Sequence, residues 1–325
     1  MGQTSIEWTE HSFNPVVGCT KASLGCQNCY ALQMAVRLAH NPKLPADVRE
    51  RYISTVRKVG GKWEWSGKVA LFPERLDEPL GRRKPTRYFV PSMGDLFHKD
   101  VPFWFVRNVW GMMALCPQHT FQVLTKRPKR MLDFVSREWV AHVHTEKVTQ
   151  RYTEPVLAGL CDILPNVWLG TSIENQAAAD KRIPLLLQTP AAVRFVSAEP
   201  LLEEIDLTHL YGHISFGDRV DLTVDALSGK YVPAWAGRKA KPDTLLSKID
   251  VGKLDWVICG TESGPGARPW DWDWIRNLRD QCQVARVPFF LKQVTVDGKK
   301  VPLPELDGRT WSEMPGQAQE VEVEG

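Results

Sequence analysis

The chain has 325 residues, of which 43% are hydrophobic and 24% are charged, and its formal net charge is +3. This ordinary globular composition excludes a largely disordered chain, and no stretch approaches the roughly 20 apolar residues that cross a bilayer. The small net charge does not by itself indicate a polyanionic partner. The polar start, MGQTSIEWTEH, lacks the apolar segment of a secretory signal, so we expect a cytoplasmic protein without a membrane anchor.

Short apolar runs alternate with helical patterns along the chain. Strands are predicted at 12–18, 87–93, 120–126, 166–173, 192–200, 254–263 and 288–294. Helices are predicted at 29–40, 101–117, 128–143, 174–190 and 271–287. Such alternation is typical of βαβ units on a parallel sheet. Most of the strands end in polar residues, and in a barrel these ends meet at one mouth. We therefore predict an α/β fold, a (β/α) barrel that is complete or partial, with about six or seven parallel strands.

The regular pattern covers residues 1–305, which we predict to form a single domain. It is interrupted by insertions at about 41–86, 144–164 and 205–253, the first with a short hairpin around 62–72. The segment 306–325 ends in an acidic sequence without a core-forming pattern, and we expect it to be a mobile tail. The active site is expected at the carboxyl ends of the strands.

Three of the seven cysteines lie within eleven residues, as Cys19, Cys26 and Cys29 in the pattern C-x6-C-x2-C. The other four lie singly in apolar segments, which is typical of buried thiols. In a reducing compartment, clustered cysteines indicate a metal rather than disulfides. Structural zinc needs a fourth ligand, such as His11 or His98. A [4Fe–4S] cluster on three thiolates would keep one iron without a protein ligand, able to accept a substrate or cofactor.

A three-cysteine loop after the first strand of a (β/α) barrel, with Tyr30 after the last cysteine, resembles the radical S-adenosylmethionine (SAM) superfamily. The phrases TSIEWTEHSFNPVVGC, VPSMGDLFHKDVP, FQVLTKRP, NVWLGTSIENQ, VRFVSAEPLL and GTESGPGARP resemble a phage- and bacterium-associated subfamily of unassigned function. The likeness covers nearly all of residues 4–295. The cysteine spacing departs from the superfamily's commonest pattern, C-x3-C-x2-C, so the shape of the cluster loop is not given by the resemblance.

The resemblance implies a [4Fe–4S] cluster on Cys19, Cys26 and Cys29 that reductively cleaves SAM to a 5'-deoxyadenosyl radical, which abstracts hydrogen from an unknown substrate. An electron donor such as flavodoxin or ferredoxin is implied as a partner. The methionine amino group would contact the strand end that carries Ser92, Gly94 and Asp95, and its carboxylate would contact Lys126 or Arg127. The remaining cofactor-binding candidates are Ser172, Glu174 and Asn175 near the ribose, with Ser197 and Glu199. Substrate candidates are Glu262, Ser263, Arg268 and Lys292.

Simpler interpretations exist for the same residues. Acidic and hydroxyl side chains at strand ends also cap the helices that follow, and Lys126 and Arg127 precede Pro128 as solvated loop charges would. The basic segment 51–87 is interleaved with Trp63 and Trp65, which fits nucleic-acid contact, so a nucleobase or nucleotide is one possible substrate. A hairpin whose tryptophans pack on the barrel explains it as well. Two other functions remain open: a zinc-stabilised nucleic-acid-binding module without catalysis, and an iron–sulfur electron carrier.

Overall fold

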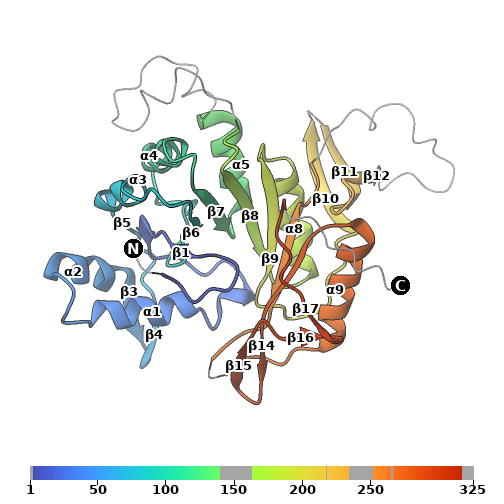
Figure 1. Cartoon of the computed structure of the whole chain (residues 1–325). Coiled ribbons are helices and arrows are strands. Elements are labelled where there is room, and N and C mark those ends of the chain that lie inside the picture. The colour runs from blue at the N-terminus through green and yellow to red at the C-terminus, as the bar shows by residue number, and fades with distance from the viewer. Residues whose placement is uncertain (1–2, 140–162, 217, 234–251, 265, 317–325) are drawn as a thin grey trace. The chain divides into compact units, whose positions relative to one another are not determined.

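Figure 1 shows the computed structural model, which describes residues 3–139, 163–216, 218–233, 252–264 and 266–316. The chain divides into two compact units. The first unit comprises Met1–Ser172 and Gln188–Ala192, and the second comprises Ile173–Leu187 and Val193–Gly325. Almost all of the predicted insertion 144–164 lies outside the described residues.

The first unit contains four parallel strands in the order β1, β6, β7, β8. Their bounds are His11–Ser12, Arg87–Val90, Thr120–Thr125 and Val167–Ile173. Helix α4 (Phe103–Ala114) follows β6, and α5 (Pro128–Asp133), which continues as a π-helical turn to Trp139, follows β7. Most side chains of β6, β7 and β8 are buried, as expected for parallel strands covered on both faces. The predicted alternation of strands and helices is confirmed here.

The first predicted strand, 12–18, is wrong in its extent. The structure divides it into β1, which pairs with β6 in the parallel sheet, and β2 (Val16–Val17), which pairs antiparallel with β5 (Ala70–Leu71). Pro15 lies between the two pieces. Because proline has no N–H to donate to a strand ladder, the chain leaves the parallel sheet there and takes a different partner.

The segment after the cysteines forms a small helical layer with a hairpin. It contains the predicted helix as α1 (Tyr30–Ala39), then α2 (Ala46–Thr55), the hairpin β3 (Val56–Val59) with β4 (Lys62–Trp65), a 3-10 turn (Pro73–Leu76) and α3 (Asp77–Leu80). Helix α2 was not predicted, and the hairpin turns at Gly60 and Gly61, ahead of the predicted position. Both glycines have positive φ, which a two-residue hairpin turn favours. An apolar cluster that includes Ala35, Trp65 and Phe72 holds this layer together.

The second unit contains three parallel strands in the order β9, β13, β14, with β15 added antiparallel at the edge. Their bounds are Val193–Ala198, Trp256–Gly260, Phe289–Val296 and Lys299–Pro302. Helix α8 (Gln176–Leu187) precedes β9, and α9 (Trp272–Ala285) joins β13 to β14. The Asp271 carboxylate caps α9 by accepting a bond from the Asp273 N–H, and Ile275, Leu278 and Cys282 bury one face of the helix.

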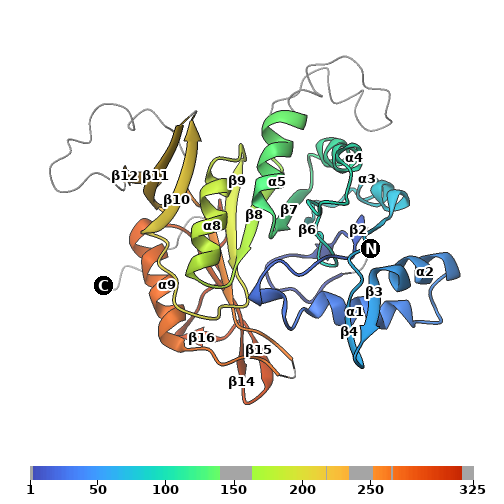
Figure 2. The ribbon, with the colours of Figure 1, turned by 180° about the vertical axis from the view of Figure 1, so that it is seen from behind.

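Two further β-structures belong to the second unit. In the predicted insertion 205–253, the structure contains an antiparallel sheet of β10 (Leu210–Phe216), β11 (Asp218–Asp225) and β12 (Lys230–Pro233). Figure 2 shows α8 next to this sheet, and the Tyr211 N–H donates to the Asp180 carboxylate of that helix at 3.1 Å. Near the end of the chain, β16 (Glu305–Leu306) and β17 (Arg309–Thr310) form a hairpin, and Trp311 is buried. The expected mobile tail from 306 therefore begins with ordered structure.

The structure confirms a mixed α/β fold with mostly parallel strands. Among the described residues, seven strands pair in parallel with a neighbour of the same unit, and β15 makes an antiparallel eighth. Closure into a (β/α) barrel remains a prediction. None of the described helices has the length and apolarity needed to span a bilayer.

Candidate functional site

The cysteine loop begins directly after β2 and is fixed by close backbone contacts. Gly18 forms a parallel bridge with Gly94, and its N–H donates to the Met93 carbonyl at 3.1 Å. A Cβ on Gly94 would lie 2.9 Å from the Val16 carbonyl oxygen, closer than real contacts allow. Gly94 is therefore required for the approach of two protein segments. We also predicted that Gly94 lets the backbone approach the cofactor, and this role stays a prediction.

The three cysteines occupy different positions on this loop. Cys19 follows β2, Cys26 ends a short 3-10 turn (Leu24–Cys26), and Cys29 is the residue before α1. All three are partly exposed and have free thiols. Cys19 and Cys29 also pack against the apolar cluster of the α1–α2 layer. Tyr30, next in the chain, donates its hydroxyl to the Ser92 carbonyl at 2.8 Å, so the loop's end is connected to the residues after β6.

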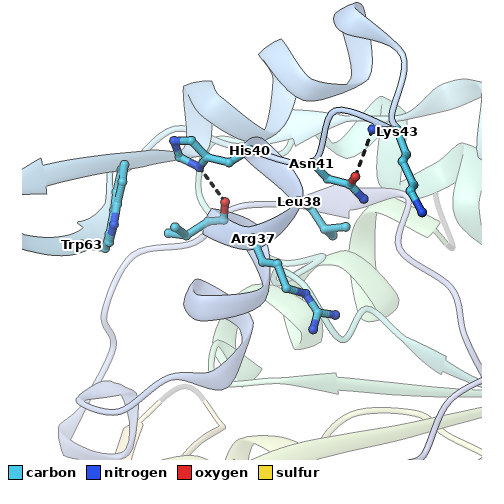
Figure 3. A pocket seen from close by; sticks show the side chains of 7 residues that line it. Arg37, Leu38, His40, Asn41, Lys43 and Trp63 are labelled. Atoms are coloured by element: carbon cyan, nitrogen blue, oxygen red, sulfur yellow. Dashed lines mark hydrogen bonds between the residues drawn. The ribbon is translucent and has the colours of Figure 1, made fainter.

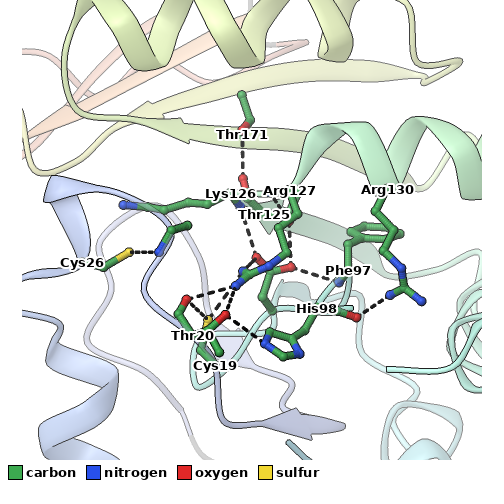
Figure 4. Close-up of polar contacts among 12 residues, drawn as sticks. Cys19, Thr20, Cys26, Phe97, His98, Thr125, Lys126, Arg127, Arg130 and Thr171 are labelled. Atoms are coloured by element: carbon green, nitrogen blue, oxygen red, sulfur yellow. Dashed lines mark hydrogen bonds and ion pairs between the residues drawn. The ribbon is translucent and has the colours of Figure 1, made fainter. Parts of the chain in front are cut away.

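Arg127 connects the carboxyl end of β7 to the start of the cysteine loop (Figure 4). One guanidinium nitrogen donates to the Cys19 Sγ at 3.5 Å and to the Asp95 carboxylate at 2.6 Å. The other donates to the backbone carbonyl of Thr20 at 3.0 Å and to its Oγ1 at 2.8 Å. The planar guanidinium presents several donors in fixed directions, so one side chain can orient both residues of the loop.

Asp95 is the acceptor at the centre of this network, which we call the Asp95–Arg127 network. Its Oδ1 accepts from the Phe97 N–H (2.9 Å) and the Thr125 hydroxyl (2.7 Å), and its Oδ2 accepts from the Lys126 N–H (3.2 Å) and from Arg127. A carboxylate can accept about four hydrogen bonds, one at each lone-pair position, so these four donors occupy all of them. The side chain is only 6% exposed. Its predicted contact with the methionine amino group stays a prediction, and that contact would have to replace an internal bond.

The charges around the three sulfurs favour different protonation states. Burial raises the pKa of the Cys19 thiol to about 12 and raises the pKa of Cys29, and the Cys26 charge contributes to both increases. Burial also acts on Cys26, but the Lys126 ammonium and the N–H of Ala22, which donates to Sγ at 3.4 Å, outweigh it and lower its pKa. Cys26 is thus the thiol most readily ionised.

His98 is buried against the same loop but contacts no sulfur in this arrangement. Its Nε2 lies 3.0 Å from the Thr20 hydroxyl, and its Nδ1 accepts from the Asp100 N–H at 3.3 Å. Both nitrogens are therefore engaged, so the predicted alternative of His98 as a fourth zinc ligand stays a prediction, and that ligation would have to replace one of these bonds. In the described part of the chain, no three His, Cys, Asp or Glu side chains are grouped closely enough to hold one metal ion.

The fit of this loop to a [4Fe–4S] cluster follows from the donor set. Each thiolate of such a cluster binds its own iron, so the sulfurs do not have to share one ion. The Cys26 charge influences the ionisation of Cys19 and Cys29, and Cys26 has a nearby cation and a backbone donor that favour the thiolate a metal requires. Cys19, Cys26 and Cys29 therefore remain suitable ligands, with Lys126 as the neighbouring cation.

Ser92 also follows β6, where the structure uses it for a loop contact. Its hydroxyl bonds with the Asn14 side chain, at 3.1 Å from Nδ2 and 3.3 Å from Oδ1. Asn14 in turn accepts from the Met93 N–H at 2.9 Å. The Ser92 side chain thus holds the chain before β2 next to the end of β6. Its predicted contact with the cofactor stays a prediction.

In the second unit, Glu199 and Lys292 form the central polar pair. The Lys292 ammonium donates to Oε1 of Glu199 at 2.8 Å, and the Ser197 hydroxyl donates to Oε2 at 3.1 Å. Both charged side chains are 15% exposed. A Cβ on Gly260 would lie 2.7 Å from Oε1, so a glycine at the end of β13 leaves the space that this carboxylate occupies. Three predicted site residues, two at the end of β9 and one within β14, are therefore brought together.

Glu262 and Arg268 pair with each other in the loop after β13. The Arg268 guanidinium donates to both carboxylate oxygens, at 2.5 and 2.9 Å, and its backbone N–H adds a third bond at 3.0 Å. Glu262 is buried, and the bidentate geometry is typical of strong Arg–carboxylate pairs. Ser263 lies in the same loop. Substrate roles for these three residues stay predictions.

The residues around the end of β8 separate into different roles. Glu174 is buried and forms a two-bond ion pair with Arg182 of α8, at 2.9 and 3.3 Å. Asn175 accepts from the Ala178 N–H at 2.9 Å, so here the capping interpretation is confirmed. Ser172 is buried within β8. The predicted contacts of Ser172, Glu174 and Asn175 with the ribose stay predictions.

Sequence reasoning missed Thr20 and Thr125, which complete the Asp95–Arg127 network. The Thr125 hydroxyl both donates to Asp95 and accepts from the Arg127 N–H at 2.9 Å. Its position at the end of a strand, directly before the two predicted cations, was the available signal. Thr20 had a similar signal, since it directly follows Cys19.

These features define a mixed α/β protein whose three-cysteine loop is held by polar residues at the carboxyl ends of parallel strands. The chain belongs to the family described as "Protein of unknown function (DUF5131)", which matches residues 3–315. No curated protein and no solved structure matches the chain.

Proposed function

We propose that the protein is a radical SAM enzyme in which Cys19, Cys26 and Cys29 hold a [4Fe–4S] cluster. The observation that carries the proposal is the attachment of the cysteine loop to the strand ends through Arg127, which bonds to Cys19, Thr20 and Asp95. A cofactor site needs such a link to the sheet, because the protein must orient its cofactor against the strand ends where substrate groups lie.

When bound, the cluster and SAM would supply a 5'-deoxyadenosyl radical that abstracts a hydrogen atom from the substrate. The chain's own residues would bind and orient. Arg127 bonds to Asp95 and to the loop, and the Lys126 charge acts on Cys26, so Lys126 is our candidate for the methionine carboxylate. Asp95 would act as a positioning residue that keeps Arg127 in place.

The proposal includes the (β/α) barrel predicted from the sequence, in which the carboxyl ends of the strands would meet at one mouth. Ser172, Glu174, Ser197 and Glu199 remain candidates for the cofactor, and Glu262, Ser263, Arg268 and Lys292 for the substrate, with a nucleobase or nucleotide as one substrate class. A cytoplasmic location with a flavodoxin- or ferredoxin-like donor would keep the thiols reduced and deliver the electron.

Metal analysis of anaerobically reconstituted full-length protein tests the ligand assignment. We expect brown protein with about four irons per chain. Cys26→Ser should lose most of the iron, whereas Cys116→Ser, a buried thiol outside the loop, should keep it. Colourless protein with one zinc per chain, or equal iron in both variants, would contradict the proposal.

A further inference from the structure

A pocket of about 790 Å³ lies in the first unit, between the end of α1, the turn that follows it and strand β4 (Figure 3). Its size falls in the range of small-molecule pockets, roughly 300–1,000 Å³. The side chains of Arg37, His40, Lys43 and Trp63 line it, together with the apolar groups of Val36 and Leu38. It therefore combines an aromatic surface, apolar contacts and positive charge.

The position of each tryptophan along β4 determines which one is accessible. Trp65, at the end of the strand, is buried in the apolar cluster of the α1–α2 layer, whereas Trp63, two residues nearer the hairpin turn, is 37% exposed. The His40 ring stands edge-on to Trp63 with centroids 5.4 Å apart. The Lys58 ammonium lies 5.9 Å from the ring centroid, near the outer limit of a cation–π contact. A planar ligand can displace this exposed cation and stack on the indole.

The segment around the pocket has more positive charge than the whole protein. Residues 31–70 contain eight Lys and Arg against three Asp and Glu, a net charge of +5, while the whole chain has only +3. The remainder of the chain is therefore slightly acidic, with net charge −2. The small net charge of the whole chain is therefore the sum of a basic segment, residues 31–70, and a slightly acidic remainder.

The cations at the pocket differ in their partners from Arg51 and Arg57 of the same segment. Arg51 pairs with Asp47 and Glu74, and Arg57 pairs with Glu64. Arg37 donates to the Met34 thioether, which is a weak acceptor. Within the described ranges, no carboxylate lies at ion-pair distance from Arg37 or Lys43. Their charges are available to an anionic ligand.

The geometry points to a binding site for an unpaired nucleotide of a single-stranded nucleic acid, with the base stacked on Trp63 and the flanking phosphates bound by Arg37 and Lys43. Exposed aromatic rings beside basic side chains are the means by which proteins bind single strands, because every base has a face that stacks. A duplex keeps its bases paired and cannot offer such a face. An acidic peptide would satisfy the cations but not the indole. This inference does not depend on the cluster.

The test uses full-length protein without cluster reconstitution and measures fluorescence anisotropy of labelled oligodeoxyuridylate and oligouridylate. The two strands differ only in the sugar, so their relative affinities show whether DNA or RNA is preferred. Stacking on one base corresponds to a roughly 5- to 150-fold loss of affinity for Trp63→Ala. Trp63→Phe, which keeps a stacking ring, should lose less. Trp104→Ala, at an exposed tryptophan of α4, is the matched control and should bind as the wild type does.

The phosphate contacts are tested by salt dependence. Each phosphate contact to a single strand contributes about −0.7 to the slope of log K against log salt, so Arg37→Ala/Lys43→Ala should reduce the slope by about 1.4. Lys181→Ala/Lys299→Ala removes two exposed charges elsewhere and should leave it unchanged. Equal effects in both double variants, tighter binding of duplex, or equal binding of oligoglutamate would overturn the inference. Loss of binding in Trp104→Ala as large as in Trp63→Ala would do the same.

Discussion

The Asp95–Arg127 ion pair is predicted to stabilise the cysteine loop strongly. Arg127→Met removes the guanidinium but keeps an unbranched side chain. The Asp95 carboxylate, 6% exposed in the wild type, would keep three of its four donors but lose its directly bonded counter-charge. Removing one partner of a buried pair costs about 3–5 kcal/mol. Because three hydrogen bonds to the carboxylate remain, we expect the free energy of unfolding to fall by about 3 kcal/mol, near the lower limit of this range.

A double-mutant cycle measures this interaction directly. The free energy of unfolding is determined by urea titration for the wild type, Arg127→Met, Asp95→Asn and the double variant. Because asparagine carries no charge, Asp95→Asn should cost about 2 kcal/mol less in the Arg127→Met background than in the wild type. Lys129→Met removes an exposed pair with Asp133 in the same helix and should cost below about 0.5 kcal/mol. A coupling energy below about 0.5 kcal/mol would refute the reasoning.

Two further predictions concern the cysteine loop in cluster-free protein. Cys26, with its lowered pKa, should react with iodoacetamide at pH 7.5 at least about tenfold faster than buried Cys116, whose pKa burial raises to about 11, because only the thiolate reacts. Lys126→Ala should raise the Cys26 pKa and slow its labelling at this pH; equal rates by mass spectrometry before and after the substitution would contradict this. Gly94→Ala places a methyl group 2.9 Å from a backbone oxygen and should destabilise the protein by about 1–3 kcal/mol in urea titration. Gly81→Ala, which has space and a negative φ, should be neutral or stabilising, and a similar loss in both variants would contradict the steric argument.

The elements with strong periodicity were predictable from the sequence. Helices α1 and α9 lie inside their predicted ranges, because each has a regular apolar face. Helix α2 was missed because only Tyr52 and Thr55 of its ten residues are buried, which gives almost no periodic signal. The first strand was overextended because a run of apolar residues does not show that its two ends pair with different partners.

The sequence predicted that polar residues follow the strands, but it did not predict the contacts that these residues make. Lys126 and Arg127 are adjacent cations after one predicted strand, so the sequence gives no reason to assign them different partners. Only the fold shows that Arg127 reaches Thr20, 107 positions earlier in the chain. Trp63 and Trp65 likewise look equivalent in the sequence, because residues two apart on a strand share a face, yet only Trp65 is covered by the α1–α2 layer. In both pairs the difference comes from partners that are distant in the sequence, and a local sequence pattern does not indicate such partners.

Formation of 5'-deoxyadenosine tests the central claim most directly. Anaerobically reconstituted full-length protein is given SAM and a strong reductant, and the product is quantified by liquid chromatography. The account predicts that the wild type and Cys116→Ser form 5'-deoxyadenosine and that Cys26→Ser does not. Iron-loaded wild-type protein that leaves SAM intact would contradict the account.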